Sequence, residues 1–207
     1  MTSLVSNPFR LVLTGGPCGG KTTSLAQLRE RLESAGYAVF VVPEIPSILI
    51  GGGANLGGLS AQDFRVFETN VLSLQLGFEN AFIDLARADS KRSVIIYDRG
   101  LMDPSAYVTS ELWSELLESN GWTEEGLCDD RYDLVIHLTS ASIGAPDHYV
   151  WSLEGIRKEP PELAADLDQK VERAWRRHPE HHVIDNSTNF DEKLERVWAL
   201  IAQRLSI

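Results

Sequence analysis

Cysteine, long apolar runs and basic side chains are all scarce in this chain. The 207 residues include two cysteines, Cys18 and Cys128, which cannot form a disulfide framework. No apolar run reaches the length of about 18 residues that a membrane span needs, and the first residues (MTSLVSNPFR) lack the charged start and apolar centre of a signal peptide. These absences argue against a disulfide-stabilised secreted scaffold and predict a cytoplasmic protein with no membrane span.

Basic residues are outnumbered, since 19 Lys and Arg stand against 30 Asp and Glu, for a formal charge of −11. Nucleic-acid binding surfaces are basic, so this balance argues against nucleic acid as a partner. A small phosphorylated ligand remains compatible, because only its pocket must be positive. The length predicts a single α/β domain over residues 1–207, with a small lid segment at about 140–178.

One run carries clear chemistry. Residues 15–22 (GGPCGGKT) match the phosphate-loop pattern G-x-x-x-x-G-K-[ST], between an apolar stretch typical of a strand (9–14) and an amphipathic stretch typical of a helix (21–34). Backbone N–H groups and the helix dipole would bind a nucleoside triphosphate there, with a charge from Lys21 and a Mg²⁺ ligand from Thr22. A glycine-rich turn that matches by chance is the alternative. The predicted nucleotide-binding residues are Gly15, Gly16, Pro17, Cys18, Gly19, Gly20, Lys21, Thr22 and Thr23.

Strand and helix signals alternate along the chain, which predicts a parallel sheet covered on both faces. The expected strands are 9–14, 37–42, 93–97, 132–138 and 182–184. The expected helices are 21–34, 63–89 and 161–177, a short one from Asp103 and a last one from about Asn189. In the helix at 63–89, apolar residues recur at steps of three and four, which predicts a stripe in the core that includes Leu74 and Leu85. Residues 47–60 (SILIGGGANLGGLS) are rich in glycine and predict a loop near the active site.

Charged residues follow two of the expected strands. Asp98 and Arg99 follow the strand at 93–97. Because strand ends in a parallel sheet share one edge, both residues should lie near the phosphate loop. Asp98 is therefore a predicted Walker-B-like ligand for Mg²⁺, and Arg99 a predicted partner for phosphate or carboxylate. Solvation of a strand end is the simpler alternative. Glu44 follows the second strand and could act as the general base, or be a turn carboxylate between two prolines. Asp103 precedes a proline, so helix capping competes there with acceptor binding.

A basic pair, Arg157 and Lys158, lies in the irregular segment before the helix expected at 161–177. In a kinase, a lid at this place would bring a cation over the transferring phosphate and exclude water. Arg157 is therefore a predicted catalytic residue, with an exposed charged loop as the alternative.

Four motifs in order, GGPCGGKTT, VVPEIP, IIYDRGLMDPSAY and VIDNS, make the chain resemble the small AAA-type ATPase domains grouped with the ribosylnicotinamide kinase of NadR proteins. The resemblance implies a three-layer P-loop kinase fold with sheet order 2-3-1-4-5, helices on both faces, and ATP or GTP bound with Mg²⁺. More distantly, the chain looks like thymidylate and deoxynucleoside kinases. The segment is too short for the extra helical domain of hexameric AAA machines, so protein remodelling is not implied.

The same resemblance implies roles for single residues. It places Glu44 near the acceptor, matches Asp98 and Arg99 to an acidic-Arg pair, and puts Asp185 and Asn186 near the nucleotide base. It also supports Arg157 as a lid residue. The acceptor pocket matches no recognised nucleoside site, so no specific substrate follows.

Together these features predict a Mg²⁺-dependent phosphotransferase that moves the γ-phosphoryl group of ATP to a small nucleoside-like or nucleotide-like acceptor. The catalytic residues would be Lys21, Glu44, Asp98, Arg99 and Arg157, and the metal ligands Thr22 and Asp98. The alternative is a regulatory ATP- or GTP-binding switch that engages a protein or lipid partner through the glycine-rich loop. The choice between ATP and GTP stays open, and the sequence is compatible with a homodimer.

Overall fold

The computed structural model describes residues 7–57, 60–149 and 160–207. Its centre is a five-stranded sheet in the order β2-β3-β1-β4-β5, with every neighbouring pair parallel. This order confirms the expected fold. The strands are β1 (Phe9–Thr14), β2 (Ala38–Val42), β3 (Ser93–Asp98), β4 (Leu134–Leu138) and β5 (His181–Ile184).

The middle strand β1 is apolar because both of its faces are covered. Leu11 and Leu13 pack into one core cluster and Val12 into another, and all three side chains are fully buried. Such strands read as continuous apolar runs rather than as an alternation. The register pairs Leu13 with Asp98 of β3, so the ends of β1 and β3 lie side by side.

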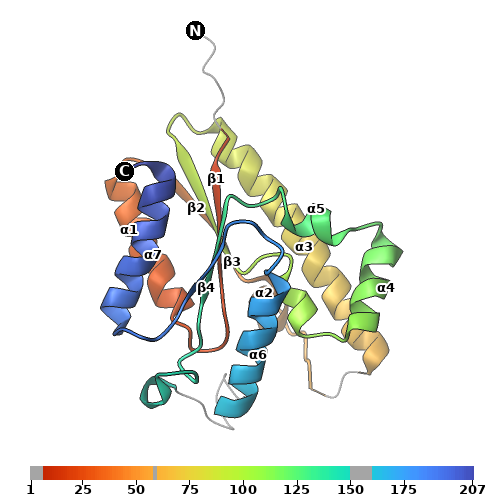
Figure 1. Cartoon of the computed structure of the whole chain (residues 1–207). Helices are drawn as coiled ribbons and strands as arrows, with labels where there is room; N and C mark the ends of the chain where they lie inside the picture. The colour runs from red at the N-terminus through yellow and green to blue at the C-terminus, as the bar shows by residue number, and fades with distance from the viewer. Residues whose placement is uncertain (1–6, 58–59, 150–159) are drawn as a thin grey trace.

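Helices cover both faces of the sheet (Figure 1). On one face lie α1 (Lys21–Ser34) and α7 (Phe190–Leu205), joined by the Arg31–Glu195 ion pair. On the other lie α3 (Ala61–Ala88), α4 (Ser110–Asn120), α5 (Glu124–Cys128) and α6 (Pro161–Ala174). Short elements connect them: α2 (Ile45–Gly51) and the 3-10 turns η1 (Asp103–Ala106) and η2 (Pro146–His148). Within the described ranges, no helix has the length and apolar character needed to cross a membrane.

Some predicted elements were wrong. The loop expected at 47–60 begins as helix α2, with Pro46 in its first turn, where proline needs no hydrogen-bond partner for its nitrogen. Helices α4 and α5 lie in a stretch that carried no predicted element. Each of these two helices has a threonine cap, since Thr109 accepts from Leu112 N–H and Thr123 accepts from Gly126 N–H. Caps of this kind stabilise a helix, so a short helix can form even where its apolar periodicity is weak.

The buried face of α3 also differs from the expected apolar stripe. Leu74 and Leu85, expected in the core, are 37% and 56% exposed. Glu68, Gln75 and Glu79 are buried instead, with at most 5% of each residue exposed. Side chains of this face therefore meet either polar partners or a cavity.

Candidate active site

The glycines of the phosphate loop lie where a side chain would not fit. A Cβ atom on Gly15, whose φ is +132°, would lie 2.1 Å from the carbonyl oxygen of Leu138 in β4, and one on Gly19 would lie 2.4 Å from the same oxygen. Gly20 (φ 91°) is the N-cap of α1, and no side chain caps this helix. The loop thus packs on the end of β4 and leaves the first N–H groups of α1 available to an anion.

Lys21 spans the loop. Its ammonium group donates to the carbonyl oxygens of Gly15 and Gly16, each at 2.9 Å. Burial, and then the positive charge of Arg99, lower the pKa of Lys21 to about 7, although Asp98 acts in the opposite direction. A bound polyphosphate would supply the negative charge that this ammonium group lacks.

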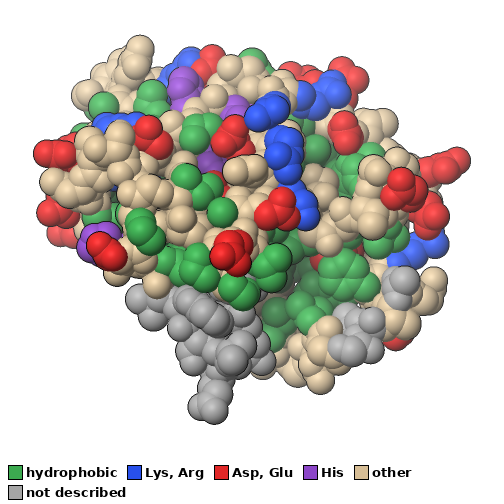
Figure 2. All heavy atoms as spheres, turned by 60° about the horizontal axis from the view of Figure 1, so that its bottom comes forward, with side chains coloured by type: hydrophobic (Ala, Val, Ile, Leu, Met, Phe, Trp, Pro, Cys, Tyr) green, Lys and Arg blue, Asp and Glu red, His purple; other side chains and the backbone are tan. Residues whose placement is uncertain are grey.

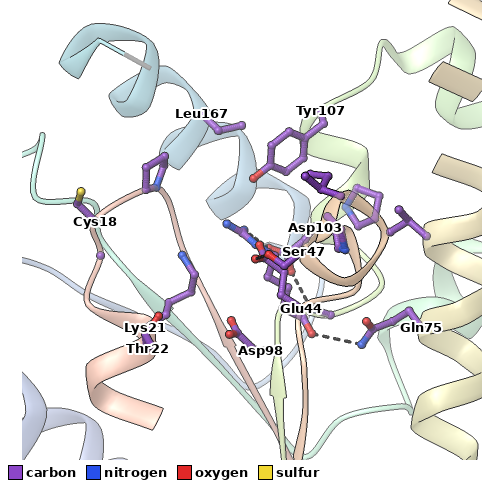
Figure 3. Close-up of a pocket in the computed structure, with 18 of the residues that line it drawn as sticks. Cys18, Lys21, Thr22, Glu44, Ser47, Gln75, Asp98, Asp103, Tyr107 and Leu167 are labelled. Carbon is purple, nitrogen blue, oxygen red and sulfur yellow. Dashed lines mark hydrogen bonds and ion pairs between the residues drawn. The ribbon is translucent and has the colours of Figure 1, made fainter. Parts of the chain in front are cut away.

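Asp98 faces the loop from the end of β3. Figure 3 shows its carboxylate between Lys21 and Thr22 of α1 on one side and Glu44 on the other. Burial and the charge of Glu44 raise the pKa of Asp98, against the effect of Lys21 and Arg99. Within the described part of the chain, no group donates a hydrogen bond to this carboxylate or to the Thr22 hydroxyl. These two oxygen ligands fit Mg²⁺, which takes one or two protein oxygens beside phosphate and water.

A chain of hydrogen bonds joins β2, β3 and η1 across the site. Arg99 donates through Nε to Glu44 (2.5 Å) and through a terminal nitrogen to Asp103 (3.2 Å), while Ser47 Oγ donates to the other oxygen of Glu44. Arg99 adopts φ 71°, a left-handed conformation that a non-glycine residue reaches at a cost. Burial disfavours the charged form of Glu44, but Arg99 and Ser47 outweigh burial and lower the pKa of Glu44. Glu44 is therefore an ionised acceptor of hydrogen bonds.

Asp103 is a buried junction of the fold. Its carboxylate accepts from Thr14 Oγ1 (2.5 Å), Gly100 N–H (2.9 Å) and Trp175 Nε1 (3.2 Å), in addition to Arg99. Of the two roles that the sequence left open for Asp103, helix capping does not occur here, because Met102 is the N-cap of η1 and no described side chain caps that turn. Asp103 instead ties the ends of β1 and β3 to α6.

Asp168 supports the phosphate loop from α6 and was missed by sequence reasoning. Its Oδ1 accepts from the N–H groups of Gly16 (2.7 Å) and Ser140 (2.9 Å), and His137 Nε2 lies 3.2 Å away. Burial raises the pKa of Asp168, but His137 and the two N–H groups outweigh burial, and the net pKa lies below the usual value. The only signal in the sequence was a carboxylate next to Leu167 in an amphipathic helix.

Lys193 supports the loop from the other face of the sheet. This buried ammonium group donates to the carbonyl oxygens of Gly19 (3.3 Å) and Thr139 (2.9 Å) and to Asn186 Oδ1 (2.7 Å). Burial lowers the pKa of Lys193 to about 8, with Asp168 acting the other way. Like Asp168, Lys193 holds loop backbone and was not predicted.

The predicted base-binding residues, Asp185 and Asn186, already have partners within the fold. Asn186 donates to the carbonyl oxygens of Ser140 (2.8 Å) and Ile143 (2.7 Å), so its amide already serves the fold. Asp185 is exposed and pairs with Arg196 at 2.7 Å. Neither residue lines the cavity next to the phosphate loop. Arg157 and Lys158 lie outside the described residues.

A cavity of about 570 Å³ adjoins the phosphate loop and extends to α2 and α3. Loop residues 17–23, Glu44, Asp98 and Arg99 line its polar part. Figure 2 brings this edge of the molecule forward and shows apolar side chains around the hollow. The lining residues from α2 and α3 are Pro46, Ser47, Ile50, Phe64, Phe67, Glu68, Val71 and Gln75.

Replacement of Asp168 should loosen the loop. We expect Asp168→Ala to lower the free energy of unfolding by about 2–4 kcal/mol, because two buried N–H groups lose their acceptor, and to weaken ATP binding. Urea unfolding and calorimetric titration measure the two effects. Asp166→Ala is the matched control, since Asp166 is exposed on the same helix and, among the described residues, pairs with Lys170 alone, at i,i+4. Equal stability of the two variants would contradict this role.

The lowered pKa of Lys21 predicts proton uptake on nucleotide binding. A pKa near 7 leaves Lys21 mostly neutral at pH 8, and bound phosphates raise it, so ATP binding should take up roughly one proton at pH 8 and almost none at pH 6. Calorimetry in buffers of different ionisation enthalpy counts these protons. Lys21→Arg should abolish the uptake, because a guanidinium group stays charged. Uptake that does not change between pH 6 and pH 8 would refute the assignment.

Comparisons with known proteins agree with this geometry. Residues 10–193 match the family model described as AAA domain. The chain is similar in structure to deoxyadenosine kinase from M. mycoides with bound dATP (TM-score 0.57, 16% identity, covering 93% of this chain and 98% of that one). It is also similar to thymidylate kinase from Ehrlichia chaffeensis (TM-score 0.61, 14% identity, covering 95% and 100%). No curated protein matches the chain. Because the family model spans most of the sequence, this protein belongs to the AAA domain family, and its fold is that of P-loop kinases.

Proposed function

We propose that this protein transfers the γ-phosphoryl group of ATP to a hydroxyl group of a small nucleoside-like or nucleotide-like acceptor. The observation that carries the proposal is the cavity itself. One cavity contains a phosphate loop and also a largely apolar region on α2 and α3, with Glu44 and Arg99 among its lining residues. A nucleotide switch needs the loop but has no use for a second substrate region.

In the proposed reaction, loop N–H groups and Lys21 bind the β- and γ-phosphates. Thr22 and Asp98 would hold Mg²⁺, which supplies positive charge to the phosphate oxygens when bound. The acceptor oxygen bonds to the γ-phosphorus, the bond from that phosphorus to the bridging oxygen breaks, and ADP leaves. Glu44, kept ionised by Arg99, accepts the hydrogen bond of the attacking hydroxyl group and takes up its proton.

Arg157 is proposed as the lid cation over the transferring phosphoryl group. We also propose that residues 1–207 form one domain with its lid at about 140–178, and that the protein belongs to the ribosylnicotinamide-kinase-like group. Mg²⁺ dependence, a cytoplasmic location and a homodimer complete the proposal. Asp185 and Asn186 remain proposed neighbours of the nucleotide base. Asn186 would contribute there by positioning backbone, since its amide bonds three carbonyl groups.

Nucleoside diphosphate release from Mg·ATP and Mg·GTP, with and without pooled nucleosides, nucleotides and small alcohols, tests the function. We expect one pool to stimulate release at least tenfold in the wild type and not in Lys21→Ala. Slow release that no pool changes, with nucleotide binding retained, would contradict the kinase and favour the regulatory switch.

Glu44→Gln should lower kcat about 10²–10⁴-fold, because the amide cannot take up the proton of the acceptor hydroxyl group. ATP affinity should stay within about threefold. Glu33→Gln is the control, since Glu33 forms a half-exposed pair with Arg29 away from the cavity. Steady-state rates with the stimulating pool measure the difference, and an unchanged kcat would remove Glu44 from the mechanism.

Arg157→Ala should lower kcat about 10²-fold with little effect on ATP affinity, because a lid cation would act on charge that develops during transfer. Arg176→Ala is a suitable control, since the Arg176 side chain is 65% exposed and its one ion pair within the described ranges is with Glu172 on α6. Equal rates for the two variants would exclude Arg157 from the site.

A further inference from the structure

Glu68 is a buried carboxylate that the proposed mechanism does not use. It lies on α3, is 5% exposed, and lines the cavity. No other described residue forms a hydrogen bond or ion pair with it. Burial alone raises the pKa of Glu68 to about 7.

Its neighbours on the same face of α3 are treated differently by the fold. Glu79 receives hydrogen bonds from Arg131 (2.5 Å), Tyr132 (2.8 Å) and Gln75 (3.0 Å). A buried polar group without a partner lowers stability, so such groups are normally satisfied. Among the described residues, Glu79 has a full set of partners and Glu68 has none, which favours a ligand as the partner of Glu68.

The position of Glu68 identifies which part of a ligand it meets. Gln75 Nε2 donates to the carbonyl oxygen of Arg99 (3.4 Å), the residue after Asp98, so Gln75 lies beside the end of β3, where Asp98 and Arg99 line the cavity. Glu68 lies two helical turns earlier on the same face, about 10 Å along the helix axis. That separation suits a nucleoside-sized acceptor whose hydroxyl group points toward Glu44 and whose far end points toward Glu68.

The walls near Glu68 suit a flat ring. Phe64 and Phe67 line the cavity from the same helix, with ring centroids 6.4 Å apart and an interplanar angle of 19°. Val71 adds an apolar surface one turn further along. Aromatic and aliphatic walls favour the faces of a planar ring, and a lone carboxyl group among them adds one directional hydrogen bond at the edge of that ring.

We propose that Glu68 accepts a hydrogen bond from an amino group on a planar nitrogen-containing ring of the acceptor. Glu68 would thereby select nucleosides whose base carries this amino group over analogues that lack it. This inference rests on the proposed function and names the chemistry of its acceptor. A site built around a hydrogen-bonding group discriminates strongly against a ligand that leaves that group unpaired.

Matched nucleoside pairs test the proposal. Adenosine is compared with purine riboside, and cytidine with pyrimidin-2-one riboside, since each pair differs by one amino group. Binding is measured by calorimetry with Mg²⁺ and a non-hydrolysable ATP analogue, and transfer by ADP release from ATP. The proteins are wild type, Glu68→Leu, Glu68→Gln and the control Asp84→Leu, which removes an exposed carboxylate from the same helix.

We expect the wild type and Asp84→Leu to prefer the amino member of at least one pair by tenfold or more. Glu68→Leu should reduce this preference to within twofold and leave ATP affinity unchanged, while Glu68→Gln keeps part of it through its amide oxygen. The unfolding midpoint of Glu68→Leu should rise, since an unpartnered buried carboxyl group is removed. A general loss of packing would instead lower binding of both members equally.

Three results would overturn the proposal. The preference could survive in Glu68→Leu, the wild type could bind neither amino member, or the wild type could bind both members of each pair equally. Amino-selective binding that depends on Glu68, without any ADP release, would support the Glu68 assignment while refuting phosphoryl transfer. The two inferences therefore fail separately.

Discussion

A buried guanidinium group held between two carboxylates organises this site. Arg99 reaches Glu44 after β2 and Asp103 in η1, and its own N–H donates to the carbonyl oxygen of Leu13 in β1 (3.1 Å). The guanidinium group satisfies both buried carboxylates in this geometry, and these interactions offset the cost of the left-handed backbone of Arg99. Without Arg99, Glu44 and Asp103 would lose their common cation, and the cavity would lose one of the side chains that line it near Glu44.

Charge along the cavity is distributed according to this arrangement. Arg99 keeps Glu44 ionised, whereas Asp98, only one residue earlier in the chain, has a raised pKa and no hydrogen-bond donor among the described residues. Two nearby carboxylates with opposite shifts are suited to different tasks. Glu44 is ionised and can accept the hydrogen bond of an attacking hydroxyl group, and Asp98 suits a metal ion, as proposed. Lys21 lacks a full set of negative partners until phosphate is present.

Patterns among neighbouring residues predicted the parts of the structure that interactions between neighbouring residues determine. The strand, loop and helix around residues 9–34 follow from neighbours in the chain. Asp98 was expected near the loop because the ends of parallel strands share one edge, and the structure pairs Asp98 with Leu13 of β1. Asp168 and Lys193 could not be found in this way, because their loop partners lie 152 and 174 residues away. The polar face of α3 was missed for a related reason. Periodicity assumes that buried positions are apolar, whereas Glu79 has an arginine partner and Glu68 faces a cavity.

The support of Gly16 by Asp168 has a consequence for how the phosphate loop can be reused. One of the loop's own N–H groups is committed to a helix from the far end of the chain, and Lys193 of α7 holds the carbonyl group of Gly19 from the opposite face of the sheet. The eight-residue motif therefore depends on residues outside itself for its conformation. A designer who grafts it onto another strand and helix must also supply a buried anion on one side and a buried cation on the other.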